Sequence, residues 1–396
     1  RIGFRIKNGN LFVGIQNHQS ENNYSYQLGN NKEKLSNAEA QIFHSVIGLN
    51  KELSSAWKLK SNFWFTNANR QIPSNILAAP GTEYQKDESW RGQLELVRTK
   101  VKTTISFNQS ASIDNLKFVN PETSINSFYK SFQGNWQFNY GYQLNPRNQV
   151  KISTFHQHQK ALNFLKGDPE LYQTGTKASW INQGNRGYLA ANASIQHFNQ
   201  GFTPMNYELV LSQKWKGWNA KLIHNTSFRA PTLNDLFWPV SGNKDLLPEE
   251  GFKVQGVLNK KIRCKNKTDW WYAELGLQVA EYQNQIIWLP GNFSNLWSPI
   301  NIKQTYHTNS HLKVKGFKEV SQFKINILSN LQYLMANENN LFERGNQLAY
   351  APELLWNNSV QLAYKKHQVM LSHSSQSASF TSTDNTSQID GFSIFG

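Results

Sequence analysis

The segment SFQGNWQFNYGYQLNPRN, residues 131–148, alternates apolar and amide side chains. The apolar members of one parity are Phe132, Trp136, Phe138, Tyr140, Tyr142 and Leu144, and the amides of the other are Gln133, Asn135, Gln137, Asn139 and Gln143. Because successive side chains of a strand point to opposite faces, this pattern predicts one long strand with an aromatic face and an amide face. Asn145-Pro146-Arg147-Asn148 then predicts a tight turn.

The same alternation recurs along the chain, at residues 57–65, 271–279 and 323–333. Strands of about 10 residues reach about 34 Å, whereas strands in soluble sheets usually have about 5–6 residues. Length combined with alternation is typical of transmembrane β-barrel strands, whose apolar parity faces lipid and whose polar parity faces a wet lumen. Residues 35–48 also fit a helix.

Short and long connections alternate between these segments. Tight turns are predicted near 7–9, 50–55, 98–101, 145–148, 184–186, 216–217, 265–268, 315–318 and 365–367, and longer polar loops near 19–36, 68–90, 109–127, 160–174, 229–249, 288–301, 336–347 and 382–389, with a shorter one near 199–205. We therefore expect an all-β, antiparallel, up-and-down transmembrane barrel of about 19 strands. Single-chain bacterial barrels usually close with an even number, so the odd count predicts an incomplete barrel.

Composition narrows the function classes. The formal net charge of +15 raises nucleic acid, anionic membranes and acidic ligands as partners, but no nucleic-acid-binding motif is present. Mean hydropathy is -0.61, and no apolar run approaches the roughly 18–20 residues of a spanning helix. The single cysteine, Cys264, excludes an internal disulfide. RIGFRIKNGN at the start reads as mid-strand, so we expect a fragment.

Charge follows the polarity of the connections. Lysines and arginines gather at the short turns, as in residues 98–102, 260–267 and 313–318, and many acids lie in the long loops. This pattern fits ordinary solvated turns, and it also fits an axial field that acts on a partner or on lipid at the tight-turn end.

A second segment, FRAPTLNDLFWPVSGNKDLLPEE at residues 228–250, resembles an extracellular loop of TonB-dependent receptors, the plugged outer-membrane barrels that import siderophores and vitamin B12. The residues that match the family pattern in order are Arg229, Ala230, Pro231, Thr232, Asp235, Leu236, Phe237, Gly242, Asn243, Leu246, Pro248 and Glu249. Lys244 stands where the family often has proline, and Gln255 where a strand glutamate is usual.

Further segments resemble the same family over almost the whole chain. They are residues 69–74, 286–301, 347–353 and 381–392, while Asn309 and His311 depart from its pattern. The resemblance implies a barrel of 22 strands preceded by a plug, of which residues 1–396 would form the second to the twentieth strand. The plug, the energy-coupling segment, the first strand and the last strands would lie outside the chain.

The same resemblance implies partners and a place in the cell. We expect a monomer in the outer membrane, surrounded by lipid and lipopolysaccharide, that binds a small-molecule ligand. The TonB complex would act through the missing N-terminal region. No cofactor and no nucleic acid are expected.

Candidate ligand-side residues come from the loop motifs. They are Arg229, Pro231, Asp235, Phe237, Trp238, Gly242, Asn243, Leu246, Pro248, Glu249, Trp288 and Trp297. Arg229 and Glu249 fit ligand contact, but an ion pair that fixes the loop is favoured, since Pro231 and Pro248 cannot donate to a strand ladder. The three tryptophans fit stacking on a ligand, and an interfacial aromatic girdle is favoured.

No residue pattern supports catalysis or a metal site. His156 and His158 share one strand face without a third ligand, and neither a nucleophile elbow nor a phosphate-binding glycine loop occurs. Three functions stay open: energy-coupled uptake of cobalamin or a ferric siderophore, a passive porin or surface-binding barrel, and a soluble β-rich carbohydrate-binding protein. The first is favoured by the motifs, and the third would be extracted without detergent.

Overall fold

The computed structural model describes residues 2–74, 81–162, 168–199, 201–238, 241–264, 268–291, 294–338, 345–382 and 384–396. Its main sheet has 20 strands, one of which is the two-residue β13 (Gly201–Phe202), leaving 19 that follow one another as an antiparallel meander. The meander strands are β1 (Ile2–Ile6), β2 (Gly9–Ser20), β5 (Ala40–Glu52), β6 (Trp57–Gln71), β7 (Tyr84–Thr99), β8 (Thr103–Asn120), β9 (Ile125–Asn145), β10 (Asn148–Leu162), β11 (Glu170–Gly184), β12 (Gly187–Phe198), β14 (Asn206–Trp215), β15 (Trp218–Arg229), β16 (Glu249–Arg263), β17 (Trp270–Gly291), β18 (Ser294–Val320), β19 (Phe323–Asn337), β20 (Leu354–Tyr364), β21 (His367–Gln376) and β24 (Phe392–Phe395). The expected all-β antiparallel fold is confirmed.

The small elements lie in the connections. They are β3 (Ser25–Leu28), β4 (Asn31–Lys34), β22 (Ser379–Phe380), β23 (Gln388–Ile389) and the helix α1 (Leu233–Phe237). In the described part of the chain no helix is long and apolar enough to cross a membrane.

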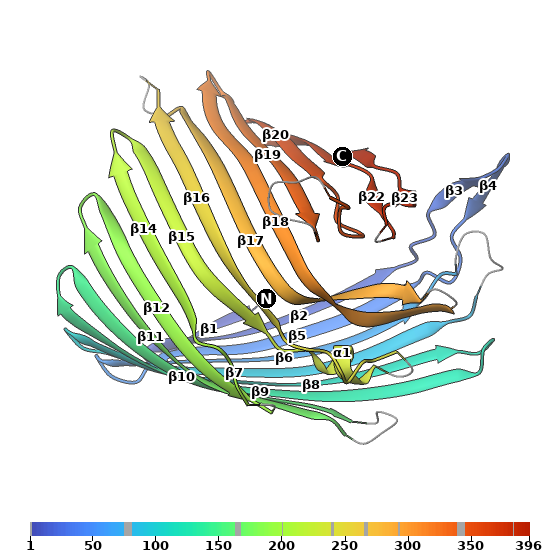
Figure 1. Ribbon diagram of the computed structural model, residues 1–396, viewed down its shortest axis with the longest axis horizontal. Coiled ribbons are helices and arrows are strands. Elements are labelled where there is room, and N and C mark those ends of the chain that lie inside the picture. Colours follow the sequence, from blue (N-terminus) through green and yellow to red (C-terminus); the bar gives the residue numbers. More distant parts are fainter. Residues whose placement is uncertain are drawn as a thin grey trace.

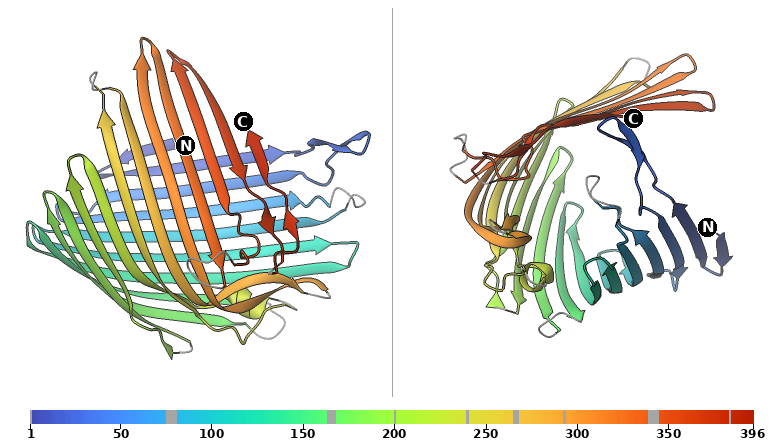
Figure 2. Two further views of the ribbon diagram at one scale, coloured as in Figure 1. Left: turned by 45° about the horizontal axis from the view of Figure 1, so that its top comes forward. Right: turned by 90° about the vertical axis from the view of Figure 1, so that its right-hand side faces the viewer.

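The sheet curls strongly, with β1 at one edge and β24 at the other (Figures 1 and 2). β1 pairs with β2 and β24 pairs with β21, and within the described residues the two edge strands form no pairing with each other.

Residues 131–148 show how the alternation becomes structure. Trp136 and Phe138 of β9 are 41% and 45% exposed. On the opposite face Asn139 is buried, donates to Ser106 Oγ at 2.9 Å and accepts from Ser153 Oγ at 2.8 Å. Three neighbouring strands therefore share a lateral polar network on one face and expose aromatic rings on the other. We call the parity with the exposed apolar residues the outer face and the opposite parity the inner face.

The structure resolves one ambiguity of the sequence and corrects one expectation. Residues 40–52, which overlap the stretch that also fitted a helix, form β5. Many expected long loops are continued strands: β8 and β9 are joined by residues 121–124 alone, and 288–301 belongs mostly to β17 and β18. In these segments the alternation of apolar and polar residues ends although backbone pairing continues. The predicted turn near 265–268 falls mostly outside the described residues.

Candidate functional site

The 229–249 connection joins β15 to β16 at the long-loop end of the sheet, where α1 lies (Figure 1). Arg229 and Glu249 are register partners at the last rung of the β15–β16 pairing. Pro248 directly precedes Glu249, and Pro231 comes two residues after Arg229. The prolines therefore mark the strand ends, as expected.

Arg229 lies at the centre of an ion-pair cluster. Its guanidinium donates to both carboxylate oxygens of Glu249, at 2.7 Å and 2.6 Å, and to Asp235 Oδ2 at 3.3 Å. The Arg229 side chain is 42% exposed, but those of Glu249 and Asp235 are only 17% and 7% exposed. Glu249 Oε1 also accepts from the backbone N–H of Ile286 at 2.6 Å, which ties the cluster to β17.

Within the described residues Asp235, like Glu249, accepts three hydrogen bonds, and one of those to Asp235 comes from Arg229. Asp235 also accepts from the Thr232 N–H at 2.9 Å and from the Trp288 indole N–H at 2.9 Å, while its own N–H donates to Thr232 Oγ1 at 3.2 Å. The two Thr232 bonds form a capping box at the start of α1. Burial by itself raises the pKa of the Asp235 carboxyl, but the Thr232 and Trp288 hydrogen bonds and the charge of Arg229 hold that pKa below its ordinary value.

The rest of the loop folds back onto this cluster. A Cβ on Gly242 would stand 2.5 Å from the Trp238 nitrogen and 2.9 Å from the carbonyl of Leu236, so only glycine fits there without a backbone shift. Asn243 donates its N–H to Asp235 O at 2.8 Å and its side-chain amide to Pro299 O at 3.2 Å.

A small apolar cluster lies beneath the loop. Leu236, Leu246 and Ile286 are buried together, with Phe237 packed against them. Asn301 accepts from the Leu247 N–H at 2.8 Å and donates to Leu247 O at 3.0 Å. Asn301 was not selected from the sequence, although the motif segment at 286–301 includes it. The loop therefore docks onto β17 and β18 through both apolar and polar contacts.

The three candidate tryptophans have separate surroundings. Trp288 is tied to Asp235, whereas Trp238 stacks with Tyr129 at 6.2 Å and Trp297 lies against Tyr350 at 5.2 Å between ring centroids. Trp238 and Trp297 are 44% and 43% exposed, so their rings remain accessible at the rim. The structure thus brings Arg229, Asp235, Glu249 and Trp288 into one cluster and leaves Trp238 and Trp297 outside it.

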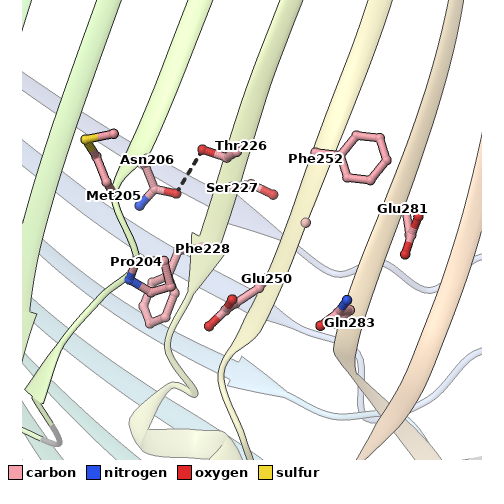
Figure 3. Close-up of a pocket in the computed structure, with 11 residues that line it drawn as sticks. Pro204, Met205, Asn206, Thr226, Ser227, Phe228, Glu250, Phe252, Glu281 and Gln283 are labelled. Carbon is pink, nitrogen blue, oxygen red and sulfur yellow. Dashed lines mark hydrogen bonds between the residues drawn. The ribbon is translucent and has the colours of Figure 1, made fainter.

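A pocket of about 220 Å³ opens beside these residues but on the other face of the sheet (Figure 3). Its lining includes Thr226, Phe228, Glu250 and Phe252, which share the parity of the exposed Leu222 and Leu258 and thus the outer face. Arg229 and Glu249 take the opposite parity and lie on the inner face. None of the twelve candidate residues lines this pocket, so it is separate from the loop site.

The paired histidines form ring contacts. His158 stacks on Tyr172 at 4.5 Å and His156 on Trp136 at 5.1 Å. Across the described ranges no group of three or more His, Cys, Asp or Glu side chains could hold a metal ion. Cys264 is a free, exposed thiol.

Two curated relatives share short segments with the chain. A vitamin B12 transporter from Vibrio vulnificus is 26% identical over 103 residues, which are 26% of this chain and 15% of the relative. A vitamin B12 transporter from Photobacterium profundum is 38% identical over 82 residues, which are 20% of this chain and 12% of the relative. The matches therefore span only a small part of the relatives' length, and no family model matches the chain.

Solved structures match nearly the whole chain. The FrpB iron transporter from Neisseria meningitidis has a TM-score of 0.72 at 10% identity and is covered over 99% of this chain and 70% of its own. The siderophore receptor PiuA from Acinetobacter baumannii has a TM-score of 0.72 at 11% identity, covering 99% of this chain and 71% of its own. At these identities the likeness establishes the fold.

The copper transporter OprC gives the same result, with a TM-score of 0.73 at 9% identity over 99% of this chain and 68% of its own. These relatives are transporters and receptors rather than enzymes. The resemblance of the chain to the barrel portion of outer-membrane receptors of this type, expected from the loop motif, is confirmed.

Proposed function

We propose that the chain forms the barrel wall of a TonB-dependent outer-membrane receptor, which takes up a scarce small molecule with energy supplied from the inner membrane. Cobalamin is the first candidate ligand and a ferric siderophore is the second. The observation that carries the proposal is the fold likeness to iron and siderophore transporters together with the segments shared with two vitamin B12 transporters. The full protein would add the plug and coupling region that contact the TonB complex, and it would act as a monomer in a bilayer with lipopolysaccharide.

We assign the ion-pair cluster a supporting role. Arg229, Asp235 and Glu249 saturate one another and the surrounding backbone, so few of their hydrogen-bonding positions are left for a ligand. The accessible rings of Trp238 and Trp297 are better placed to touch a ligand, because an exposed aromatic face at the rim can stack on it. The cluster would then hold the loop that carries Trp238.

Growth of a deletion strain tests the uptake proposal. Cells that lack the gene should grow poorly when cobalamin is limiting, and a plasmid copy should restore growth. A defect confined to siderophore-bound iron would select the second ligand. Unchanged growth in both media would refute both ligands.

A passive porin is the alternative from the sequence. The resemblance of residues 228–250 disfavours it, because these residues resemble a loop of coupled receptors and not of porins. A porin should also admit unrelated solutes of similar size. Loss of the gene would then slow the entry of many solutes at once.

A further inference from the structure

The strands β7 to β10 lie next to one another in the sheet (Figure 1). Each carries a lysine on the outer face near its long-loop end. Lys86 shares the parity of the exposed Trp90, and Lys117 that of the exposed Ile113. These lysines are Lys86 on β7, Lys117 on β8, Lys130 on β9 and Lys160 on β10.

Two of these lysines oppose each other directly. Lys86 and Lys117 are register partners in the β7–β8 ladder, which places their Cβ atoms about 5 Å apart. Lys130 stands one diagonal step away, opposite Asn115 and two residues from Phe128, the partner of Lys117. Like charges directly opposite each other destabilise a sheet pair unless a counter-charge joins them.

The protein supplies little of that counter-charge. Lys160 is paired with Glu170, but within the described part of the chain Lys86, Lys117 and Lys130 form no ion pair. Glu88 lies on the same face, opposite Asn115, and its carboxylate accepts from the Trp90 indole at 2.8 Å and from the Asn115 amide at 3.4 Å. Lys86, Lys117 and Lys130 thus share one patch of the outer face, where Lys86 Nζ lies over the Tyr84 ring at 5.6 Å and none of the three has an ion-pair partner among the described residues.

The surface next to the lysines is apolar. Toward the middle of the strands the outer face exposes Trp90, Ile113 and Trp136 at 40%, 37% and 41%, and Phe107 and Phe138 extend the same surface. An anion held by the lysines therefore lies at the edge of a surface suited to acyl chains. A lipid headgroup meets both conditions, whereas a free phosphate ion would use only the charge.

We propose that Lys86, Lys117 and Lys130 bind the phosphate groups of an anionic glycolipid in the outer leaflet, with its acyl chains over the adjoining apolar surface. This inference rests on the proposed outer-membrane location. Strands are about 4.8 Å apart, so the three lysines span about 10 Å across β7–β9, wide enough for a headgroup with more than one phosphate. The site is separate from the inner-face cluster at Arg229.

Lipid binding by the full-length protein in detergent tests the proposal. The probe is bisphosphorylated lipid A, with dephosphorylated lipid A and inorganic phosphate as comparisons. The triple variant Lys86→Gln/Lys117→Gln/Lys130→Gln should bind the bisphosphorylated probe about a hundredfold more weakly, since each lysine near a lipid surface contributes about fivefold. The corresponding triple Lys→Arg variant should keep the affinity.

The matched control is Lys151→Gln/Lys177→Gln/Lys221→Gln, which removes the same charge from the inner face of β10, β11 and β15. It should bind the probe as the wild type does. The proposal is overturned if the Lys86→Gln/Lys117→Gln/Lys130→Gln variant and the control variant bind the bisphosphorylated probe with equal affinity, whether that affinity is kept or lost. It is also overturned if the wild type binds dephosphorylated lipid A or inorganic phosphate as tightly as the bisphosphorylated probe. Fractionation of wild-type cells separates the two hypotheses: a protein outside the outer membrane refutes the proposed function, whereas an outer-membrane protein that ignores lipid A phosphates refutes only this inference.

Discussion

Replacement of Arg229 by methionine should release the 230–248 loop without unfolding the sheet. The change keeps much of the side-chain length but removes the guanidinium that joins Glu249 and Asp235. Breaking a fully buried pair costs about 3–5 kcal/mol, and the 42% exposure of Arg229 reduces this to about 2–3 kcal/mol. Because Glu249 also accepts from the Ile286 N–H, the loss of stability should extend to the part of β17 around Ile286.

Hydrogen exchange by mass spectrometry on the detergent-solubilised protein measures this loss locally. Amides of residues 230–248 should exchange about 30- to 150-fold faster in the variant, while those in the middle of β15 and β16 stay protected. The control is Arg91→Met, which breaks a 3.2 Å pair with Asp114 whose side chains are 61% and 41% exposed. That pair should contribute about 0–1 kcal/mol. If Arg229→Met and Arg91→Met change the hydrogen-exchange rates of the surrounding amides equally, Arg229 does not hold the loop through Glu249 and Asp235.

Three further predictions concern the same loop. Gly242→Ala should destabilise the loop by about 1–3 kcal/mol, because its Cβ would meet backbone at 2.5 Å, and the loss should appear as faster proteolysis between β15 and β16. The control Gly92→Ala, whose Cβ meets nothing within 4 Å, should leave that cleavage unchanged. Equal cleavage of the two variants would contradict the packing argument. The folded-state pKa of Asp235 is depressed, so its stabilisation of the loop is fully present above about pH 4 and is lost as pH falls through the folded pKa. Asp235→Asn should therefore abolish this part of the pH dependence of hydrogen exchange. Trp288→Phe removes one donor to the Asp235 carboxylate and should shift the acid loss of protection to higher pH, and an unshifted profile would show that the indole bond is dispensable.

The strand pattern was predictable because its cause is local. Residues 132–144 alternate, and a two-residue period can be recognised from the neighbours of each residue alone. The ends of β8, β17 and β18 were not predictable, because polar residues above the apolar band continue to pair through backbone bonds that carry no side-chain signal. The capping and ion-pair residues of the loop could be named from the motif, but their convergence with Trp288, 53 residues from Asp235, depends on the register of three strands.

The lysines of the proposed lipid site also could not be grouped from the sequence alone. Lys86, Lys117 and Lys130 are separated by 31 and 13 residues (117 − 86 and 130 − 117), and nothing local marks them as a group. Only the β7–β8 and β8–β9 registers bring them onto one face. A site whose residues come from several strands of a meander can therefore be recognised only when the strand register is known.

Uptake of labelled cobalamin and labelled ferric siderophore by intact cells, with and without an uncoupler of the proton gradient, tests most directly whether the protein is an energy-coupled receptor. Wild-type cells should accumulate one of the two ligands above the external concentration, and both the uncoupler and deletion of the gene should abolish that accumulation. Gene-dependent entry that only equilibrates with the medium and ignores the uncoupler would contradict coupled uptake and identify a passive pore.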